Sequence, residues 1–178
     1  MKKARKGRSK LILGLGGAAS GKSQVALDLA GEAGPRAFVA TGQALDREMK
    51  VRIERHQATR SSDWETAEVP ADLAEWFCGN RNSYQTIVLD CLTLWLSNLK
   101  GRKLHDVAVL DATDDLLQAI RLTKARVVIV SNELGLGLVP ATKNVRAFRD
   151  LAGRVNQQVA AEADEVYLTV SGLPLRLK

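Results

Sequence analysis

The 178-residue chain has the length of one domain with a sizeable core, and its 46% apolar and 26% charged residues argue against a disordered protein. No apolar run approaches the roughly 18 residues that a membrane span needs. The net charge of +6 lies in the first ten residues, which hold six basic and no acidic residues, whereas the remainder carries 20 of each sign. We therefore expect a basic, disordered extension over residues 1–10 and a single domain over residues 11–178.

Apolar runs of strand length alternate with helical patterns along the chain. The runs predict strands at 10–15, 37–41, 86–90, 126–131 and 165–171. Helical periodicity predicts helices at 22–30, 46–56, 111–124 and 144–163, and Pro70 is expected to open a short helix bearing Leu73, Trp76 and Phe77. This alternation is typical of an α/β fold, a largely parallel sheet flanked by helices. A Gly172-Leu173-Pro174 break predicts a C-terminal hairpin that adds an edge strand.

A glycine-rich motif joins the first predicted strand to the first predicted helix. It fits the pattern G-x-x-x-x-G-K-S and comprises Gly16, Gly17, Ala18, Ala19, Ser20, Gly21, Lys22 and Ser23. Glycines let backbone N–H groups face phosphate oxygens, and the helix N-terminus adds partial positive charge. We expect Lys22 to meet the outer phosphates and the Ser23 hydroxyl to ligate Mg²⁺. The motif predicts a P-loop NTPase fold that binds a nucleoside triphosphate.

Asp90 ends the apolar stretch "TIVLD", where a second group on the magnesium side is expected at the end of a buried strand. We expect its carboxylate to hold Mg²⁺, directly or through water, or to act as a base. These residues do not distinguish a kinase from an ATPase motor or a GTPase switch. The chain lacks an N-K-x-D guanine-reading motif, which disfavours the switch, and the charge balance of the domain disfavours a DNA motor.

The chain has two histidines, and His105 is expected in a surface loop. His56 follows Met49 and Ile53 at i, i+4 and i+7, so the three residues share the apolar face of one predicted helix. One interpretation is a half-buried structural histidine. The other is a histidine directed at the nucleotide, because a neutral imidazole is a competent nucleophile toward phosphorus.

The two cysteines, Cys78 and Cys91, form neither a C-x-x-C pair nor a zinc-binding spacing. We expect ordinary core or surface thiols in a reducing cytoplasm. The segment "LILGLGG" resembles part of a signal peptide, but cleavage there would destroy the glycine-rich motif. A cytoplasmic protein is therefore the expectation.

Longer motifs carry a resemblance to a known family. They are "GGAASGKS", "ATGQALDREMKVRIERHQATRSSDWETAE", "VLDCLTLWLSN", "VSNELGLGLVP" and "FRDLAGRVNQQVAAEADEVYLTVSG". In this order they resemble the bifunctional adenosylcobinamide kinase / adenosylcobinamide-phosphate guanylyltransferase family of cobalamin biosynthesis. The resemblance covers residues 11–178. It implies a P-loop core similar to that of recombinases and assembly as a homotrimer.

The resemblance also implies two reactions at one nucleotide site. Adenosylcobinamide would be phosphorylated by GTP or ATP, and GMP would then pass from GTP to adenosylcobinamide phosphate, giving adenosylcobinamide-GDP and pyrophosphate. His56 stands at the family's R-I-x-x-H position and would carry the GMP, with Lys22 and Asp90 as further catalytic residues. Some relatives have two adjacent histidines, and here Arg55 takes the first place.

The remaining site residues follow from the same resemblance. The GTP site would be completed by Ala40, Thr41, Gly42, Gln57, Ala58, Thr59, Arg60, Glu68 and Asp90. The polar residues of 131–140 and of 149–156 are expected near the site or at a subunit interface. Two alternatives stay open: a plain small-metabolite kinase with a structural His56, and a nucleic-acid-binding module led by the basic extension.

Overall fold

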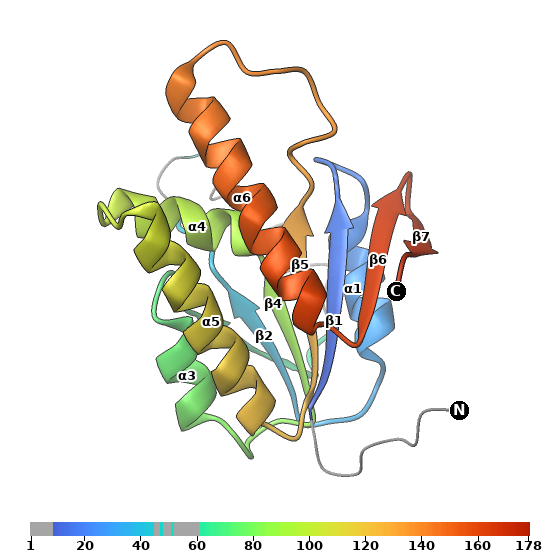
Figure 1. The fold of residues 1–178 in the computed structure, drawn as a ribbon. Coiled ribbons are helices and arrows are strands. Elements are labelled where there is room, and N and C mark those ends of the chain that lie inside the picture. The colour runs from blue at the N-terminus through green and yellow to red at the C-terminus, as the bar shows by residue number, and fades with distance from the viewer. Residues whose placement is uncertain (1–8, 45–46, 48–50, 52–60) are drawn as a thin grey trace.

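The computed structural model describes residues 9–44, 47, 51 and 61–178, and a seven-stranded sheet lies at its centre (Figure 1). The strands stand in the order β3-β2-β4-β5-β1-β6-β7. Their bounds are Lys10–Gly16 (β1), Arg36–Ala40 (β2), Trp64–Glu68 (β3), Thr86–Asp90 (β4), Arg126–Asn132 (β5), Glu165–Val170 (β6) and Leu173–Arg176 (β7). The first six strands are parallel, and β7 pairs antiparallel with β6. The predicted α/β fold and C-terminal hairpin are confirmed.

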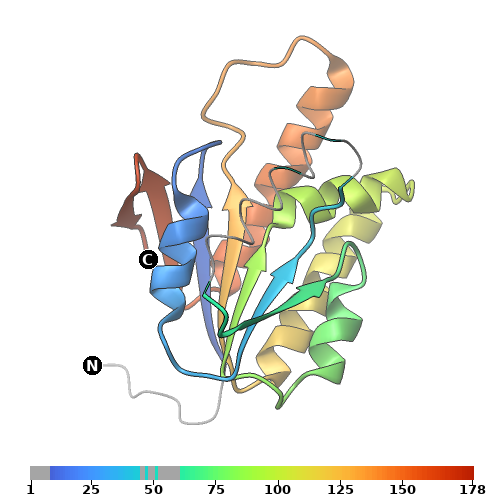
Figure 2. The same ribbon diagram turned by 180° about the vertical axis from the view of Figure 1, so that it is seen from behind.

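The helices cover the two faces of the sheet unequally. The bounds are Lys22–Ala30 (α1), Leu73–Gly79 (α3), Leu92–Gly101 (α4), Asp106–Leu122 (α5) and Lys143–Glu162 (α6). Helices α3, α4, α5 and α6 lie over one face, and α1 lies over the other (Figures 1 and 2). Because the strands run parallel, the loops that follow β1, β4 and β5 all leave from the same edge of the sheet.

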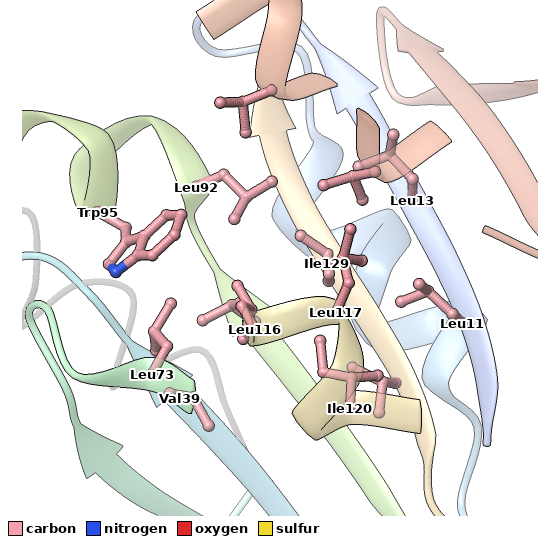
Figure 3. Packing of buried hydrophobic residues seen from close by; sticks show 14 of the residues in the cluster. Leu11, Leu13, Val39, Leu73, Leu92, Trp95, Leu116, Leu117, Ile120 and Ile129 are labelled. Carbon is pink, nitrogen blue, oxygen red and sulfur yellow. The ribbon is translucent and has the colours of Figure 1, made fainter. Parts of the chain in front are cut away.

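The larger hydrophobic core lies between the sheet and the four helices on its face. Leu13 and Ile129 of the sheet are fully buried, as are Leu116 and Ile120 of α5. Figure 3 shows these side chains together with Trp95 of α4. A smaller core lies under α1 and includes Ile12, Val88, Val128 and Val130 from three neighbouring strands. Alternate residues of each strand thus fill opposite cores, which explains why the strands read as uninterrupted apolar runs.

Several predicted boundaries differ from the structure. Strand β3 and helix α4 were not predicted, and α5 begins at Asp106 rather than at residue 111. His105 directly precedes α5 and is exposed, as expected of a surface residue. The N-terminal extension ends earlier than expected, because Ser9 is buried and Lys10 opens β1. Of the predicted helix 46–56, only residues 47 and 51 are described, and both are helical.

We predict that the indole N–H of Trp95 contributes measurably to stability. Trp95 is 1% exposed, and its Nε1 donates a hydrogen bond of 2.6 Å to the carbonyl of Ala71. Trp95→Phe removes this donor, although the carbonyl keeps the N–H of Leu73 at 2.9 Å, and leaves a gap in the core, so the free energy of unfolding should fall by about 1–3 kcal/mol in guanidinium denaturation.

Trp76→Phe is the matched control for this prediction. Trp76 is half-buried against Phe77 and Tyr84, and its indole N–H makes no hydrogen bond to a described residue. This variant should lose less than about 1 kcal/mol. Equal losses in the two variants would contradict a specific role for the Trp95 donor.

Candidate functional site

The loop between β1 and α1 presents its backbone outward. Gly17, Ala18 and Ala19 are exposed, and the chain then turns through Gly21, which has φ 87° and stands at the N-cap of α1. No side chain caps that helix end. The backbone N–H groups at the start of α1 are therefore available to an anion, which the helix dipole also favours.

Two of the glycines in this loop are required by their surroundings. A Cβ on Gly16 would lie 2.5 Å from Ser20 Oγ and 2.9 Å from the carbonyl oxygen of Thr169. A Cβ on Gly21 would lie 3.1 Å from Gly172 Cα, and its positive φ disfavours other residues. Gly172 donates its N–H to the carbonyl of Ser20 at 2.8 Å. The turn of the C-terminal hairpin thus packs against the glycine-rich loop and supports it.

Lys22 is held inside the loop. Its side chain is 8% exposed, and Nζ donates to the carbonyl of Gly17 at 2.9 Å, which folds the lysine back over the turn. The loop therefore places a fixed ammonium group beside a helix N-terminus that no side chain caps. This combination suits the oxygens of a polyphosphate.

Asp90 lies on the same face of the sheet as the loop. It is the last residue of β4, and it pairs in register with Ala40 of β2 and Val130 of β5. Val88, two residues earlier, packs in the core under α1, so alternation directs the half-buried Asp90 side chain to the α1 face. The loop and this carboxylate therefore lie at the same edge of the sheet, and their joint role in binding a nucleotide stays a prediction.

Ala40 and Glu68 end the next two strands along the same edge. They are paired in register at the ends of β2 and β3, and Glu68 is exposed. Gly42 lies two residues after the end of β2 and is half-buried. These three predicted nucleotide-site residues lie at the same edge of the sheet as Asp90, on its far side from the phosphate loop.

Thr41 holds Asp90 in place through the backbone. Its hydroxyl donates to the carbonyl of Cys91 at 2.7 Å and accepts from the Cys91 N–H at 2.9 Å, and its own N–H donates to the Asp90 carbonyl at 3.1 Å. The residue is fully buried. Because the hydroxyl proton is used inside the protein, Thr41 supports the site by positioning the strand end.

The oxygen donors present fit a magnesium ion that arrives with a nucleotide. The hydroxyl of Ser23 is half-buried in the first turn of α1, and the carboxylate of Asp90 lies on the face that α1 covers. Hydroxyl and carboxylate oxygens suit Mg²⁺, which takes few protein ligands and completes its shell with phosphates and water. Across 9–44 and 61–178 no cluster of three acidic, histidine or cysteine residues offers an all-protein metal site.

The second half of the predicted site lies outside the described residues. It comprises His56, Gln57, Ala58, Thr59 and Arg60. Their assignments therefore stay predictions from the sequence. Segment 41–44 leads into this part of the chain from the end of β2, and residue 61 leads out of it toward β3.

Several polar residues that stabilise the site were not assigned from the sequence. Asn98 of α4 donates from Nδ2 to the carbonyls of Thr41 and Pro70, both at 2.8 Å, and so ties the ends of β2 and β3 together. At the end of β5, Thr93 Oγ1 accepts from the N–H of Asn132, and Asn156 Nδ2 donates to the carbonyl of Asn132. Asn98 and Asn156 stand in the quoted motifs "LWLSN" and "RVNQ", whose polar residues on apolar helices were the available signal.

Cys91 is a buried thiol next to Asp90. Burial, and secondarily the negative charge of Asp90, raise the pKa of Cys91 to about 11, while Lys22 acts weakly in the opposite direction. The thiol is consequently protonated at physiological pH. Cys78, by contrast, is an exposed free cysteine in α3.

The fold and the site together define the class of this protein. A glycine-rich loop between the interior strand β1 and helix α1, with an acidic residue at the end of the parallel strand β4, one strand removed from β1, is the arrangement of P-loop nucleotide-binding proteins. Among the described residues, no helix has the length and apolarity that crossing a membrane requires.

Comparison with known proteins gives the family. The model of the family "Cobinamide kinase / cobinamide phosphate guanyltransferase" matches residues 12–177, so the chain belongs to this family of bifunctional transferases. The chain is 40% identical over 180 residues to "Bifunctional adenosylcobalamin biosynthesis protein CobU" of Escherichia coli K12, covering 94% of this chain and 99% of that protein. It is 42% identical over 166 residues to "Bifunctional adenosylcobalamin biosynthesis protein CobP" of Pseudomonas aeruginosa, covering 92% and 95%.

A solved structure shows a weaker likeness. "KaiC-like protein PH0186" from Pyrococcus horikoshii has a TM-score of 0.47 and 10% identity, over 90% of this chain and 71% of that one. A likeness at this level supports no functional argument. The family assignment therefore depends on the sequence relatives.

We predict that Gly16→Ala abolishes tight nucleotide binding, because the new methyl group would collide with Ser20 and with the backbone of Thr169. The affinity for GTP should fall by at least about tenfold, which corresponds to 1.4 kcal/mol. Isothermal titration calorimetry measures it. Gly14→Ala is the control, because its Cβ would meet only the Ile129 carbonyl at an ordinary 3.7 Å. Undiminished affinity in Gly16→Ala would show that the loop does not bind the nucleotide as described.

We also predict that one of the two thiols reacts in the native protein. At pH 8 a thiol with a pKa of about 11 is only about 0.1% thiolate, and the Cys91 sulfur is in addition buried. Ellman's reagent should therefore titrate one equivalent, Cys78, and a second only after unfolding. The Cys78→Ser protein should give no rapid reaction, and two rapid equivalents in native wild-type protein would contradict the buried position of Cys91.

Proposed function

We propose that this protein phosphorylates adenosylcobinamide with GTP or ATP and then converts the product to adenosylcobinamide-GDP with GMP taken from GTP. The observation that carries the proposal is family membership across residues 12–177, combined with a complete phosphate loop and a carboxylate on one face of the sheet. Relatives at 40% identity over 94% of the chain carry names that describe a bifunctional role in adenosylcobalamin biosynthesis. A cytoplasmic location and assembly into a homotrimer stay predictions.

The kinase step needs position and charge more than covalent chemistry. The acceptor hydroxyl would attack the γ-phosphorus, the bond from that phosphorus to the β,γ-bridging oxygen would break, and the nucleoside diphosphate would leave. The loop N–H groups and Lys22 would hold the β- and γ-phosphates. Mg²⁺, held by Ser23 and Asp90, would neutralise phosphate charge. Asp90 can also accept the hydroxyl proton, since its carboxylate is held at the strand end by Thr41.

The guanylyl transfer breaks a different bond. An imidazole nitrogen of His56 would attack the α-phosphorus, pyrophosphate would leave, and a phosphorus–nitrogen bond would hold GMP. The phosphate oxygen of adenosylcobinamide phosphate would then attack the same phosphorus and release the free histidine. A covalent intermediate divides one displacement between two anions into two easier steps. Glu68 and residues 57–60 are the expected contacts of the GMP portion.

The experiment that tests the proposal supplies wild-type protein with GTP, Mg²⁺ and adenosylcobinamide and follows protein and small molecules by mass spectrometry. We expect adenosylcobinamide phosphate, then adenosylcobinamide-GDP, with pyrophosphate formed in equal amount to the latter. Formation of the phosphate alone would favour the plain kinase. Replacing GTP by ATP in the first step identifies the preferred phosphate donor.

We predict that His56→Ala separates the two activities. The phosphoryl transfer should persist because it needs no histidine nucleophile, whereas guanylyl transfer should fall below detection. Wild-type protein given GTP without acceptor should gain the mass of one GMP, through a bond that is labile in acid and stable in base. A folded His56→Ala protein that still makes adenosylcobinamide-GDP would refute the histidine intermediate. His105→Ala, at the exposed start of α5, is the matched control and should retain both activities.

A further inference from the structure

We infer that the side-chain amide of Asn132 donates a hydrogen bond to the γ-phosphate of the bound nucleotide and stabilises its transfer, an inference that rests on the kinase activity proposed above. Asn132 is the last residue of β5, the strand that lies between β4 and β1. It pairs in register with Gly16, where the phosphate loop begins. Asp90 pairs with Val130, two residues earlier on the same strand. Asn132 thus ends the strand that separates the carboxylate from the phosphate loop.

The direction of the Asn132 side chain follows from its neighbours. Ser131 points to the α6 face, because its hydroxyl donates to Asn156 Oδ1 at 2.7 Å. Val128 and Val130 pack on the opposite face, in the core under α1. Since side chains alternate along a strand, Asn132 shares the α1 face with Val130. This is the face of Asp90 and of the phosphate loop.

The backbone of Asn132 is fixed by side chains of two helices that cover the face of the sheet opposite α1 (Figure 1). Its N–H donates to Thr93 Oγ1 at 3.0 Å, and its carbonyl accepts from Asn156 Nδ2 at 3.1 Å. The next residue, Glu133, donates its N–H to the carbonyl of Gly16 at 3.0 Å. The end of β5 is therefore tied to α4, to α6 and to the first residue of the phosphate loop. Such support positions a side chain for catalysis without further ordering when the substrate binds.

The side chain itself is left free to bind a ligand. Asn132 is half-buried, and its amide makes no hydrogen bond to any described residue. An amide offers two N–H donors without adding charge, so it can follow a phosphoryl group whose charge is redistributed during transfer. Lys22 and the loop N–H groups approach the phosphates from the β1 side. Asn132 adds a donor from the β5 side, toward Asp90.

The test compares wild-type protein with Asn132→Ala and Asn132→Asp, and uses Asn82→Ala as the matched control. Asn82 is exposed in the turn before β4, at the opposite edge of the sheet. Loss of one donor to the transferring group should lower the kcat of phosphoryl transfer about 10- to 100-fold in Asn132→Ala. GMP attachment from GTP leaves the γ-phosphate bond intact and should fall less than about threefold. Asn132→Asp, which places a carboxylate beside the phosphate, should lose more than the alanine variant.

The affinities for GTP and GDP provide a second measurement, because a purely structural role of Asn132 would not change one of them selectively. Affinity for GTP should fall in Asn132→Ala while affinity for GDP, which lacks the γ-phosphate, and the melting temperature stay close to those of wild-type protein. Phosphoryl transfer at the wild-type rate would overturn the inference, as would equal losses of GTP and GDP affinity. If wild-type protein phosphorylates no cobinamide, the proposed function fails, and the ratio of GTP to GDP affinity still decides the role of Asn132.

Discussion

Backbone N–H and C=O groups at the carboxyl edge of the sheet need hydrogen-bond partners inside the protein. The side chains that supply these partners determine how the candidate site is organised. A parallel sheet ends in N–H and C=O groups that no further strand pairs, and a buried group without a partner is costly. Here buried side chains supply the partners: Thr41 for the Asp90–Cys91 turn, Asn98 for the ends of β2 and β3, and Thr93 with Asn156 for the end of β5. These bonds thereby fix the strand ends that carry the residues assigned to the candidate nucleotide site, such as Asp90 and Asn132.

The two faces of the sheet differ in function: one carries the larger hydrophobic core, and the other carries the polar side chains of the candidate site. Four helices pack on one face and form the larger core, which includes Trp95 and most of the fully buried side chains. On the other face the smaller core lies under α1, and the polar strand ends extend beyond it. Asp90 and Asn132 therefore stand on rigid strands whose opposite surface is fully packed. Positions of this kind hold catalytic groups more accurately than loops do.

Much of the fold could be predicted from the sequence because most strands are buried on both faces and read as apolar runs. Strand β3 could not, because it lies at the edge of the sheet and its sequence Trp64–Glu68 is largely exposed and acidic. Helix α4 was missed for a different reason. Its buried residues Leu92, Trp95, Leu96 and Leu99 do recur at helical spacing, but the helix starts one residue after β4 and its first turn has no side-chain cap, so no start signal separates it from the strand.

Some residues of the candidate site could be predicted from the sequence and others could not. The predictable ones lie in local motifs, whereas the others are brought to the site by contacts between distant parts of the chain. The phosphate loop is a local motif, and Asp90 was recognised from the apolar strand before it. The role of Asn132 depends on β5 lying between β4 and β1, an order that requires β5 to pair with β1, whose partner residues are more than 100 positions away. The role of Asn156 depends on α6 packing against the end of that strand. No local pattern contains this information.

The support of the phosphate loop by the C-terminal hairpin has a consequence for the order of biosynthesis. Strand β1 is translated first, but both of its partners, β5 and β6, come from the second half of the chain, and Gly172 is the donor to Ser20. On the ribosome the glycine-rich loop therefore emerges long before the structure that shapes it. The complete loop therefore forms only after residues 165–172 have been synthesised, and nucleotide binding by that loop follows the pairing of β6 with β1.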